Sequence, residues 1–324
     1  MFNRVISIAE DERSGSAWTN ERMHARLDYM INIAIIWGLI LLFIFQPGIA
    51  HDGAEAGGQL FVHALLPYLL PYIILTQWLL KMPGSSNKSP VWRLFLKAFV
   101  LGSFGGFPVG AVTVTEMAKN NELTQRQSGF LLAACHAPGP MFVIGFVGSE
   151  LLGDMSTGWK LLIAIHISNI LFFLVTLFLL KSEDEISSIP PLLRKKTQSA
   201  PLLEAIKDST TIITLIATTV IFFSALGTVL ANVLSSTFKV DTGIATTFIL
   251  SIFEMTIGVQ SATDHFSTLP VFPFLIAVIL SMNGLSIHMQ VAVIAKSSNI
   301  SMIPYFIGRL WSIILVPIIF YFIY

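Results

Sequence analysis

Long apolar segments alternate with short polar ones along most of the chain. Five of them are uninterrupted, and each is long enough to cross a hydrocarbon core about 30 Å thick as a helix. These five segments are residues 28–46, 59–81, 159–180, 208–233 and 301–324. Four more are apolar but contain glycine, proline or polar residues near their middle, namely 91–118, 127–152, 241–263 and 268–296. The pattern predicts an all-α polytopic membrane protein.

Positively charged residues predict how the segments cross the membrane, because Lys and Arg collect on the cytosolic side. If 91–118 and 241–263 are re-entrant hairpins, 16 of the 19 Lys and Arg residues lie inside. Two others lie outside, and Arg309 lies within the last span. This arrangement predicts about seven full spans plus two hairpins, in an inner cell membrane and with a cytosolic N-terminus.

The composition agrees with a membrane protein. The 324 residues are 54% hydrophobic and 12% charged, whereas a soluble domain has about 25% charged residues. The net charge is zero, and no basic surface indicates a nucleic-acid partner. Residues 1–27 are polar and are not a secretory signal, because no apolar core follows a short basic start; the distribution of positive charge places them in the cytosol. Residues 181–207 form a polar linker, expected on the same side.

Residues 91–180 and 241–324 repeat one order of elements: a hairpin, a broken helix and a span. Segment 208–233 connects the two copies, and two N-terminal transmembrane helices within 28–81 precede them. The first hairpin opens from the inside and the second from the outside, so the copies form an inverted repeat. Inverted repeats with discontinuous helices are typical of secondary transporters, whose substrate site lies at the midplane where the breaks meet.

The first two breaks lie in the first copy. The residues that interrupt the helices are Gly106, Pro108 and Gly110 in the first break, and Pro138 and Gly139 in the second. They permit sharp turns and leave bare backbone groups, which suits either a ligand or a tight structural turn. His136, directly before the second break, could bind a ligand or a proton, or could only hydrogen-bond a freed carbonyl.

Glu254, in the third break, is the most informative residue of the sequence. A charged side chain at bilayer depth costs several kcal/mol (about 3), so it normally faces a polar cavity or a partner. Thr256 offers a hydroxyl at the same depth. Glu254 could hold a coupling cation, relay a proton or bind a hydroxyl of a sugar-like solute. A structural glutamate paired with one cation would give the same pattern.

The fourth break gathers four polar residues within eight positions: Asn283, Ser286, His288 and Gln290. Interhelical hydrogen bonding explains one or two such groups but not four, so a binding role is favoured. A helix that begins after Gly284 would direct its amides toward an anion. We expect Arg309 to reach the inner surface, to pair with Glu254 or to contact an anionic substrate.

The sequence shows no His-Glu-x-x-His spacing and no Gly-x-Ser-x-Gly turn. We therefore expect no enzyme, no catalytic residue and no metal or cofactor, with a coupling Na⁺ or H⁺ left open. The expected partners are a small solute and membrane lipid, and a homo-oligomer is left open. The rival hypothesis is a membrane scaffold or regulator that binds a partner complex through residues 181–207.

Several stretches, taken in order, resemble a known family: residues 104–111 and 136–145, then 254–258, 283–291 and 305–309. They resemble the sporulation integral membrane proteins of spore-forming bacteria, which carry a nucleoside-recognition or gate domain. That domain is similar to the core of concentrative nucleoside transporters. The resemblance covers about residues 90–324, whereas residues 1–60 show none.

The resemblance implies a transporter, and sporulation members of the family are associated with moving dipicolinate across the membrane around the developing spore. The pocket residues it implies are Pro108, Gly110, Pro138, Gly139, Glu254, Asn283, Ser286, His288 and Gln290. Residues 136–137 and 283–284 depart from the family's pattern at this implied pocket. Dipicolinate would use His136, His288 and Arg309. A nucleoside, the alternative substrate, would use Glu254, Asn283 and Gln290.

Overall fold

The computed structural model describes residues 26–82, 91–180 and 200–324. The regular elements of these residues are all helices, with no strand among them. The chain divides into two compact units, residues 1–50 and 51–324. Within the first unit, the structure describes one apolar helix, Arg26–Phe45. Residues 1–25, and residues 181–199 of the predicted linker, lie outside the described residues.

The remaining elements follow in chain order, with η marking a π-helix. They are α2 (Pro47–Leu60), η1 (Phe61–Leu65), α3 (Leu66–Lys81), α4 (Val91–Gly105), α5 (Val109–Lys119), α6 (Gln125–Ala134), η2 (Phe142–Leu151), α7 (Met155–Leu180), α8 (Pro201–Phe238), α9 (Thr242–Phe253), α10 (Met255–Phe266), α11 (Phe272–Met282), α12 (Gly284–Lys296) and α13 (Ile303–Ile323).

Six helical segments in the described part of the chain are long and apolar enough to cross a membrane. They are Arg26–Phe45, Pro47–Lys81, Met155–Leu180, Pro201–Phe238, Phe272–Lys296 and Ile303–Ile323. These segments confirm an all-α integral membrane protein. The predicted broken helix 127–152 is divided between α6 and η2, with the break at the expected position, because Pro138 and Pro140 lack the backbone N–H that a continuous helix needs.

Two helix boundaries differ from those expected. Residues 47–58, expected to connect two spans, are helical in α2. Helix α8 begins at Pro201, inside the predicted linker. In both cases a proline is the first helical residue, where its missing N–H costs nothing, and in α8 the acidic Glu204 follows in the first turn. Hydropathy marks the apolar part of a helix and not its start.

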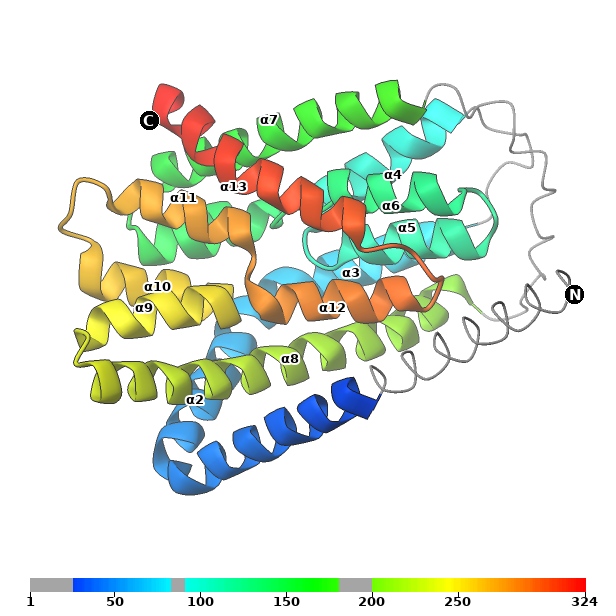
Figure 1. The fold of residues 1–324 in the computed structure, drawn as a ribbon. Helices are drawn as coiled ribbons and strands as arrows, with labels where there is room; N and C mark the ends of the chain where they lie inside the picture. The colour runs from blue at the N-terminus through cyan, green and yellow to red at the C-terminus, as the bar shows by residue number, and fades with distance from the viewer. Residues whose placement is uncertain (1–25, 83–90, 181–199) are drawn as a thin grey trace, which may run out of the picture. The chain divides into compact units, whose positions relative to one another are not determined.

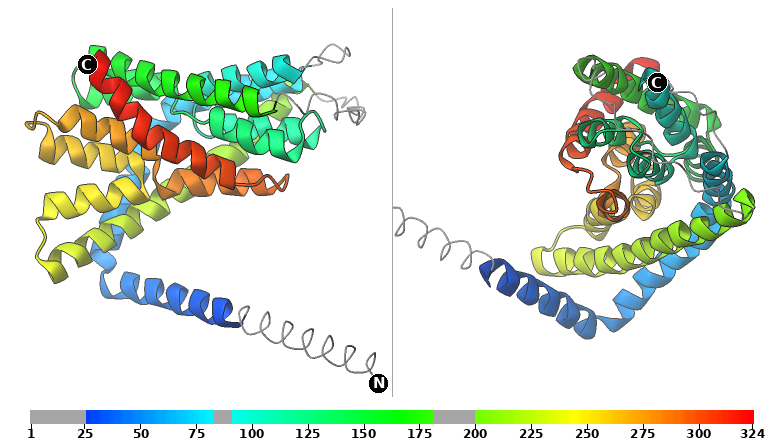
Figure 2. Two further views of the ribbon diagram at one scale, coloured as in Figure 1. Left: turned by 45° about the horizontal axis from the view of Figure 1, so that its top comes forward. Right: turned by 90° about the vertical axis from the view of Figure 1, so that its right-hand side faces the viewer.

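Within residues 51–324, the interrupted segments meet near the middle of the helical bundle. Helices α9, α10 and α11 lie toward one end in Figure 1, and α5, α6 and α12 lie toward the other. Helix α8 packs against α3, α9 and α12, whereas α13 packs against α6, α7 and α11 (Figures 1 and 2). The helix breaks therefore lie between the helices at one end, α9, α10 and α11, and those at the other, α5, α6 and α12.

Polar contacts hold the start of α7 in place. The Asp154 carboxylate accepts hydrogen bonds from the Ser156 amide at 2.9 Å and the Thr157 hydroxyl at 2.6 Å. The bond from Thr157 lowers the pKa of Asp154 below its ordinary value. Lys160 Nζ donates to the carbonyl of Tyr324 at 3.1 Å, which ties α7 to the chain end after α13.

The breaks touch one another through their backbones. Gly106 has a φ of +71°, and a Cβ atom there would lie 2.5 Å from the amide nitrogen of Gly139. Gly284 has a φ of +69°, and a Cβ atom there would lie 3.0 Å from the amide nitrogen of Met255. The first break therefore packs directly on the second, and the third on the fourth. Glycine is required at both contacts because of the left-handed conformation and the close approach.

We expect Gly106→Ala to destabilise the protein more than Gly153→Ala. Gly153 also has a positive φ, of +62°, but a Cβ atom there would have no neighbour within 4 Å. Both changes carry the left-handed strain of about 1–2 kcal/mol, and Gly106→Ala adds a clash of about 1–3 kcal/mol. Thermal unfolding of the purified protein in detergent measures the difference. Equal losses of stability would contradict the backbone contact with Gly139.

Candidate functional site

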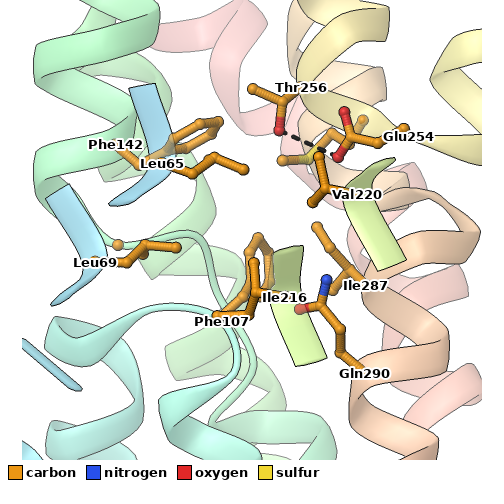
Figure 3. Close-up of a pocket in the computed structure, with 12 residues that line it drawn as sticks. Leu65, Leu69, Phe107, Phe142, Ile216, Val220, Glu254, Thr256, Ile287 and Gln290 are labelled. Carbon is orange, nitrogen blue, oxygen red and sulfur yellow. Dashed lines mark hydrogen bonds between the residues drawn. The ribbon is translucent and has the colours of Figure 1, made fainter. Parts of the chain in front are cut away.

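Residues from all four breaks line one small cavity of about 30 Å³ (Figure 3). The breaks contribute Phe107, Gly139, Glu254, Met255, Thr256, Ile287 and Gln290, whereas Leu65, Leu69, Phe142, Ile216 and Val220 complete the wall. The polar side chains are few and lie on one side of an apolar space. The volume is sufficient for a water molecule but not for an organic solute, so the cavity is nearly closed in this conformation.

Glu254 lies between α9 and α10 and is only 1% exposed. Its carboxylate accepts hydrogen bonds from the Ile257 amide at 2.8 Å and the Thr256 hydroxyl at 3.3 Å. The Ser286 hydroxyl faces it without forming a well-aligned hydrogen bond. The carboxylate thus caps the N-terminus of α10, where the helix dipole favours a negative charge. Among the described residues, no basic side chain forms an ion pair with it.

Gln290 connects the fourth break with α8. Its amide nitrogen donates to the Thr219 hydroxyl at 2.9 Å, and both side chains are buried. In Figure 3 the Gln290 and Glu254 side chains reach toward the same space from different helices. The amide, the carboxylate and the Thr256 hydroxyl on a mostly apolar wall are the kind of convergent polar groups that small-molecule sites carry.

A second polar group, the tyrosine cluster, lies around Tyr305 on α13. The Tyr305 hydroxyl is 2.8 Å from His288 Nδ1 and 3.2 Å from His136 Nε2. It therefore joins the second break to α12. A hydroxyl has one proton, so it donates to at most one of these imidazoles, and the other imidazole must donate its own N–H to the hydroxyl oxygen. The cluster has two proton arrangements as a result.

Arg309 completes the tyrosine cluster and is 5% exposed. Its Nη2 donates to the carbonyl of Ala133 at 3.2 Å. With the Asn283 amide oriented to satisfy both of its neighbours, Nη1 donates to Asn283 at 2.9 Å, and Asn283 donates to the carbonyl of Leu280 at 2.7 Å. The guanidinium also lies 5.6 Å from the ring of Tyr305. In the described structure its Nε–H has no acceptor.

The position of Arg309 rules out two of its three predicted roles in this conformation. Its side chain does not extend to the membrane surface, and it forms no ion pair with Glu254. It is held inside the bundle because carbonyls freed at helix ends offer it acceptors there. In the same way, the side-chain amide of Asn169 donates a hydrogen bond to the carbonyl of His136, at 3.4 Å.

The predicted site residues thus fall into three groups. Gly139, Glu254, Thr256 and Gln290 line the cavity, and Ser286 faces Glu254. His136, Asn283, His288 and Arg309 belong to the tyrosine cluster. Gly106, Pro108, Gly110 and Pro138 do not line the cavity and shape the backbone instead.

Sequence analysis did not identify Tyr305 as a site residue, nor Phe107 and Thr219. Tyr305 precedes Arg309 by four positions on one helix, so the two side chains share a face, and this spacing was a usable signal. Phe107 packs on His136 with ring centroids 4.4 Å apart. Thr219 carried no signal, because α8 contains several threonines that bond only to their own helix backbone.

Within the described residues, no group of three or more His, Cys, Asp or Glu side chains could hold a metal ion.

The fold defines a polytopic α-helical integral membrane protein with polar groups buried at its helix breaks. The chain is similar to "Sporulation integral membrane protein YlbJ" of Bacillus subtilis (strain 168), with 23% identity over 313 residues. The match covers 82% of this chain and 76% of that protein. No protein-family model matches the chain, and no solved structure matches it. The similarity supports a distant relationship to a sporulation membrane protein.

We expect Tyr305→Phe to destabilise the protein by about 1–3 kcal/mol, because it removes the hydrogen-bond partner of the buried His136 and the half-buried His288. The ring, and with it the contact to Arg309, is retained. Chemical unfolding of the detergent-purified protein measures the loss. The matched control is Tyr321→Phe on the same helix, whose side chain is 69% exposed and whose change should fall within about 0.5 kcal/mol. Equal effects of the two changes would contradict the hydrogen-bonded cluster.

Proposed function

We propose that the protein is a secondary transporter of a small polar organic solute, most simply a small organic anion such as dipicolinate. The observation that carries the proposal is the convergence of four helix breaks on one cavity. Irregular backbone in a bilayer is tolerated where it is buried in protein or lines a cavity, and transporters use such breaks to bind substrate. The similarity to a sporulation membrane protein is compatible with this role.

The arrangement of elements supports a transport mechanism of the inverted-repeat type. The pair α4 and α5 lies toward one end of the bundle, whereas α9 and α10 lie toward the other (Figure 1). Each pair meets a broken helix at a glycine contact, Gly106 with Gly139 and Gly284 with Met255. Motion of one pair relative to the other would open the small cavity toward one side of the membrane at a time.

The charge of the tyrosine cluster favours an anion. Arg309 is buried without a carboxylate partner in the described structure, and its Nε–H lacks an acceptor. A buried charge is costly unless it is paired. Separation of the second break from the fourth would add the N–H groups of His136 and His288 to this donor set. An anionic substrate would supply the missing acceptors.

A nucleoside remains the second candidate substrate because of one observation. Glu254 and Gln290 line the small cavity together, and Phe107 and Phe142 form part of its wall. A carboxylate and an amide beside aromatic rings would bind ribose hydroxyls and a base. With either substrate, the protein would be a carrier that catalyses no covalent step. The rival role, a scaffold or regulator in sporulation, predicts that no solute is carried.

We expect purified protein in liposomes to exchange radiolabelled dipicolinate, and Arg309→Gln to lower this exchange about tenfold or more. A hydrogen bond to a charged group contributes about 1.5–3 kcal/mol, and each 1.4 kcal/mol corresponds to about a factor of ten. The matched control is Arg93→Gln, which removes an exposed cation packed on Trp92 and should leave exchange unchanged. Exchange of nucleosides alone would favour the second candidate, and exchange of neither would favour the scaffold.

We expect Glu254→Gln to abolish accumulation driven by a Na⁺ or H⁺ gradient while counterflow of dipicolinate continues. The amide retains the size of the side chain, but it cannot bind the coupling cation. Glu55→Gln, which changes an exposed carboxylate on α2, should leave both activities intact. Unchanged accumulation in Glu254→Gln would show that Glu254 does not couple an ion to transport.

A further inference from the structure

A second and larger cavity lies beside the first along the same helices. Its volume is about 300 Å³, within the range of about 300–1,000 Å³ typical of ligand sites. Its wall is mixed. Polar side chains line it, namely Gln77, Thr115, Glu116, Lys119, Asp208, Thr211 and Ser297, together with the apolar Val112, Ile212 and Ile294. The polar residues lie at or near the ends of α3, α5 and α12 and the start of α8.

The two cavities are lined by consecutive turns of the same helices. On α8, Ile216 and Val220 line the small cavity, whereas Ile212 lines the large one. On α12, Gln290 lines the small cavity, and Ile294, four residues later, lines the large one. Four residues of a helix rise about 6 Å. The wall between the cavities is therefore about one helical turn thick.

That wall is apolar and closely packed. Ile216 is 3% exposed, and Ile212 and Val112 are also buried. Phe107 closes the small cavity from the first break (Figure 3). A layer of side chains can move by rotamer changes or a small helix shift, which is much less than the rearrangement needed to open a full bundle.

We infer that the large cavity is the vestibule through which solute reaches the small cavity, and that Ile212 and Ile216 form a thin gate between them. The inference rests on the proposed transport function. It adds the route, the gate residues and the side from which the site is reached. Solute would wait in the vestibule and enter when these isoleucines separate.

Charges in and beside the vestibule are paired. Lys119 Nζ lies 2.9 Å from Glu116, and Lys81 Nζ lies 2.6 Å from Asp208. These two lysines and two carboxylates sum to zero charge, so the vestibule neither repels an anion nor holds it at the mouth. Basic residues collect at this end of the bundle, with Lys296 ending α12 nearby, so the positive-inside rule assigns the vestibule to the cytosolic side.

Cysteine labelling tests the vestibule without any substrate. The chain has one cysteine, Cys135, which is buried, so Cys135→Ala gives a suitable background. In that background, Thr211→Cys places a thiol in the vestibule, and Val220→Cys places one in the small cavity. A charged, membrane-impermeant thiol reagent is then added to inside-out or right-side-out vesicles.

We expect Thr211→Cys to react rapidly from the cytosolic side and Val220→Cys to react at least about tenfold more slowly. Adding Ile216→Ala should raise the rate at Val220→Cys about tenfold and leave the rate at Thr211→Cys unchanged. The matched control is Ile206→Ala, an isoleucine on the same helix that is 44% exposed. Thermal unfolding checks each variant, and Ile216→Val replaces Ile216→Ala if the latter unfolds.

An unreactive Thr211→Cys, or equal effects of Ile216→Ala and Ile206→Ala, would overturn the inference. Reaction of Thr211→Cys from the outer side alone would overturn the assignment to the cytosolic face. Labelling as expected in a protein that exchanges neither dipicolinate nor nucleosides would leave the vestibule in place and contradict the proposed transport function. The two failures are therefore distinguishable.

Discussion

Backbone groups freed inside an apolar bundle must find partners, and the rest of this structure depends on that constraint. Where a helix stops in the middle of the bundle, its last carbonyls and first amides cannot reach water. Here Arg309 bonds to the carbonyl of Ala133, Asn169 to that of His136 and Asn283 to that of Leu280. Glu254 accepts from the amide of Ile257. The polar residues at the breaks therefore have a structural role, because they supply hydrogen-bond partners to the freed backbone groups.

In the proposed transporter, this constraint would give one set of residues two functions. Arg309, which satisfies a freed carbonyl, still has an Nε–H without an acceptor in the described structure. A ligand that enters between the breaks would meet groups already oriented by the backbone, which keeps the cost of binding low. The same side chains would then bind substrate and hydrogen-bond the freed backbone groups.

The sequence predicted the class of fold and most of the residues buried at the breaks, because glycine, proline and charged residues are conspicuous in apolar segments. It did not predict that those residues would form two separate groups, the lining of the small cavity and the tyrosine cluster. Glu254 and Arg309 were candidates for one ion pair, yet they lie in separate groups, because each bonds to the helix end beside it. Contacts such as that of Gln290 with Thr219 join segments 71 positions apart, and periodicity within one helix contains no information about them.

Helix α8 has a mechanical consequence that follows from its length. It runs without interruption from Pro201 to Phe238, and 38 residues extend about 57 Å, well beyond the apolar thickness of a bilayer. The helix contains no internal proline, a common cause of sharp kinks. Because it walls both cavities and also packs on α9, a tilt that spreads one end brings the other end inward. In the proposed transporter, so long a helix would keep the two ends of the bundle from opening at the same time.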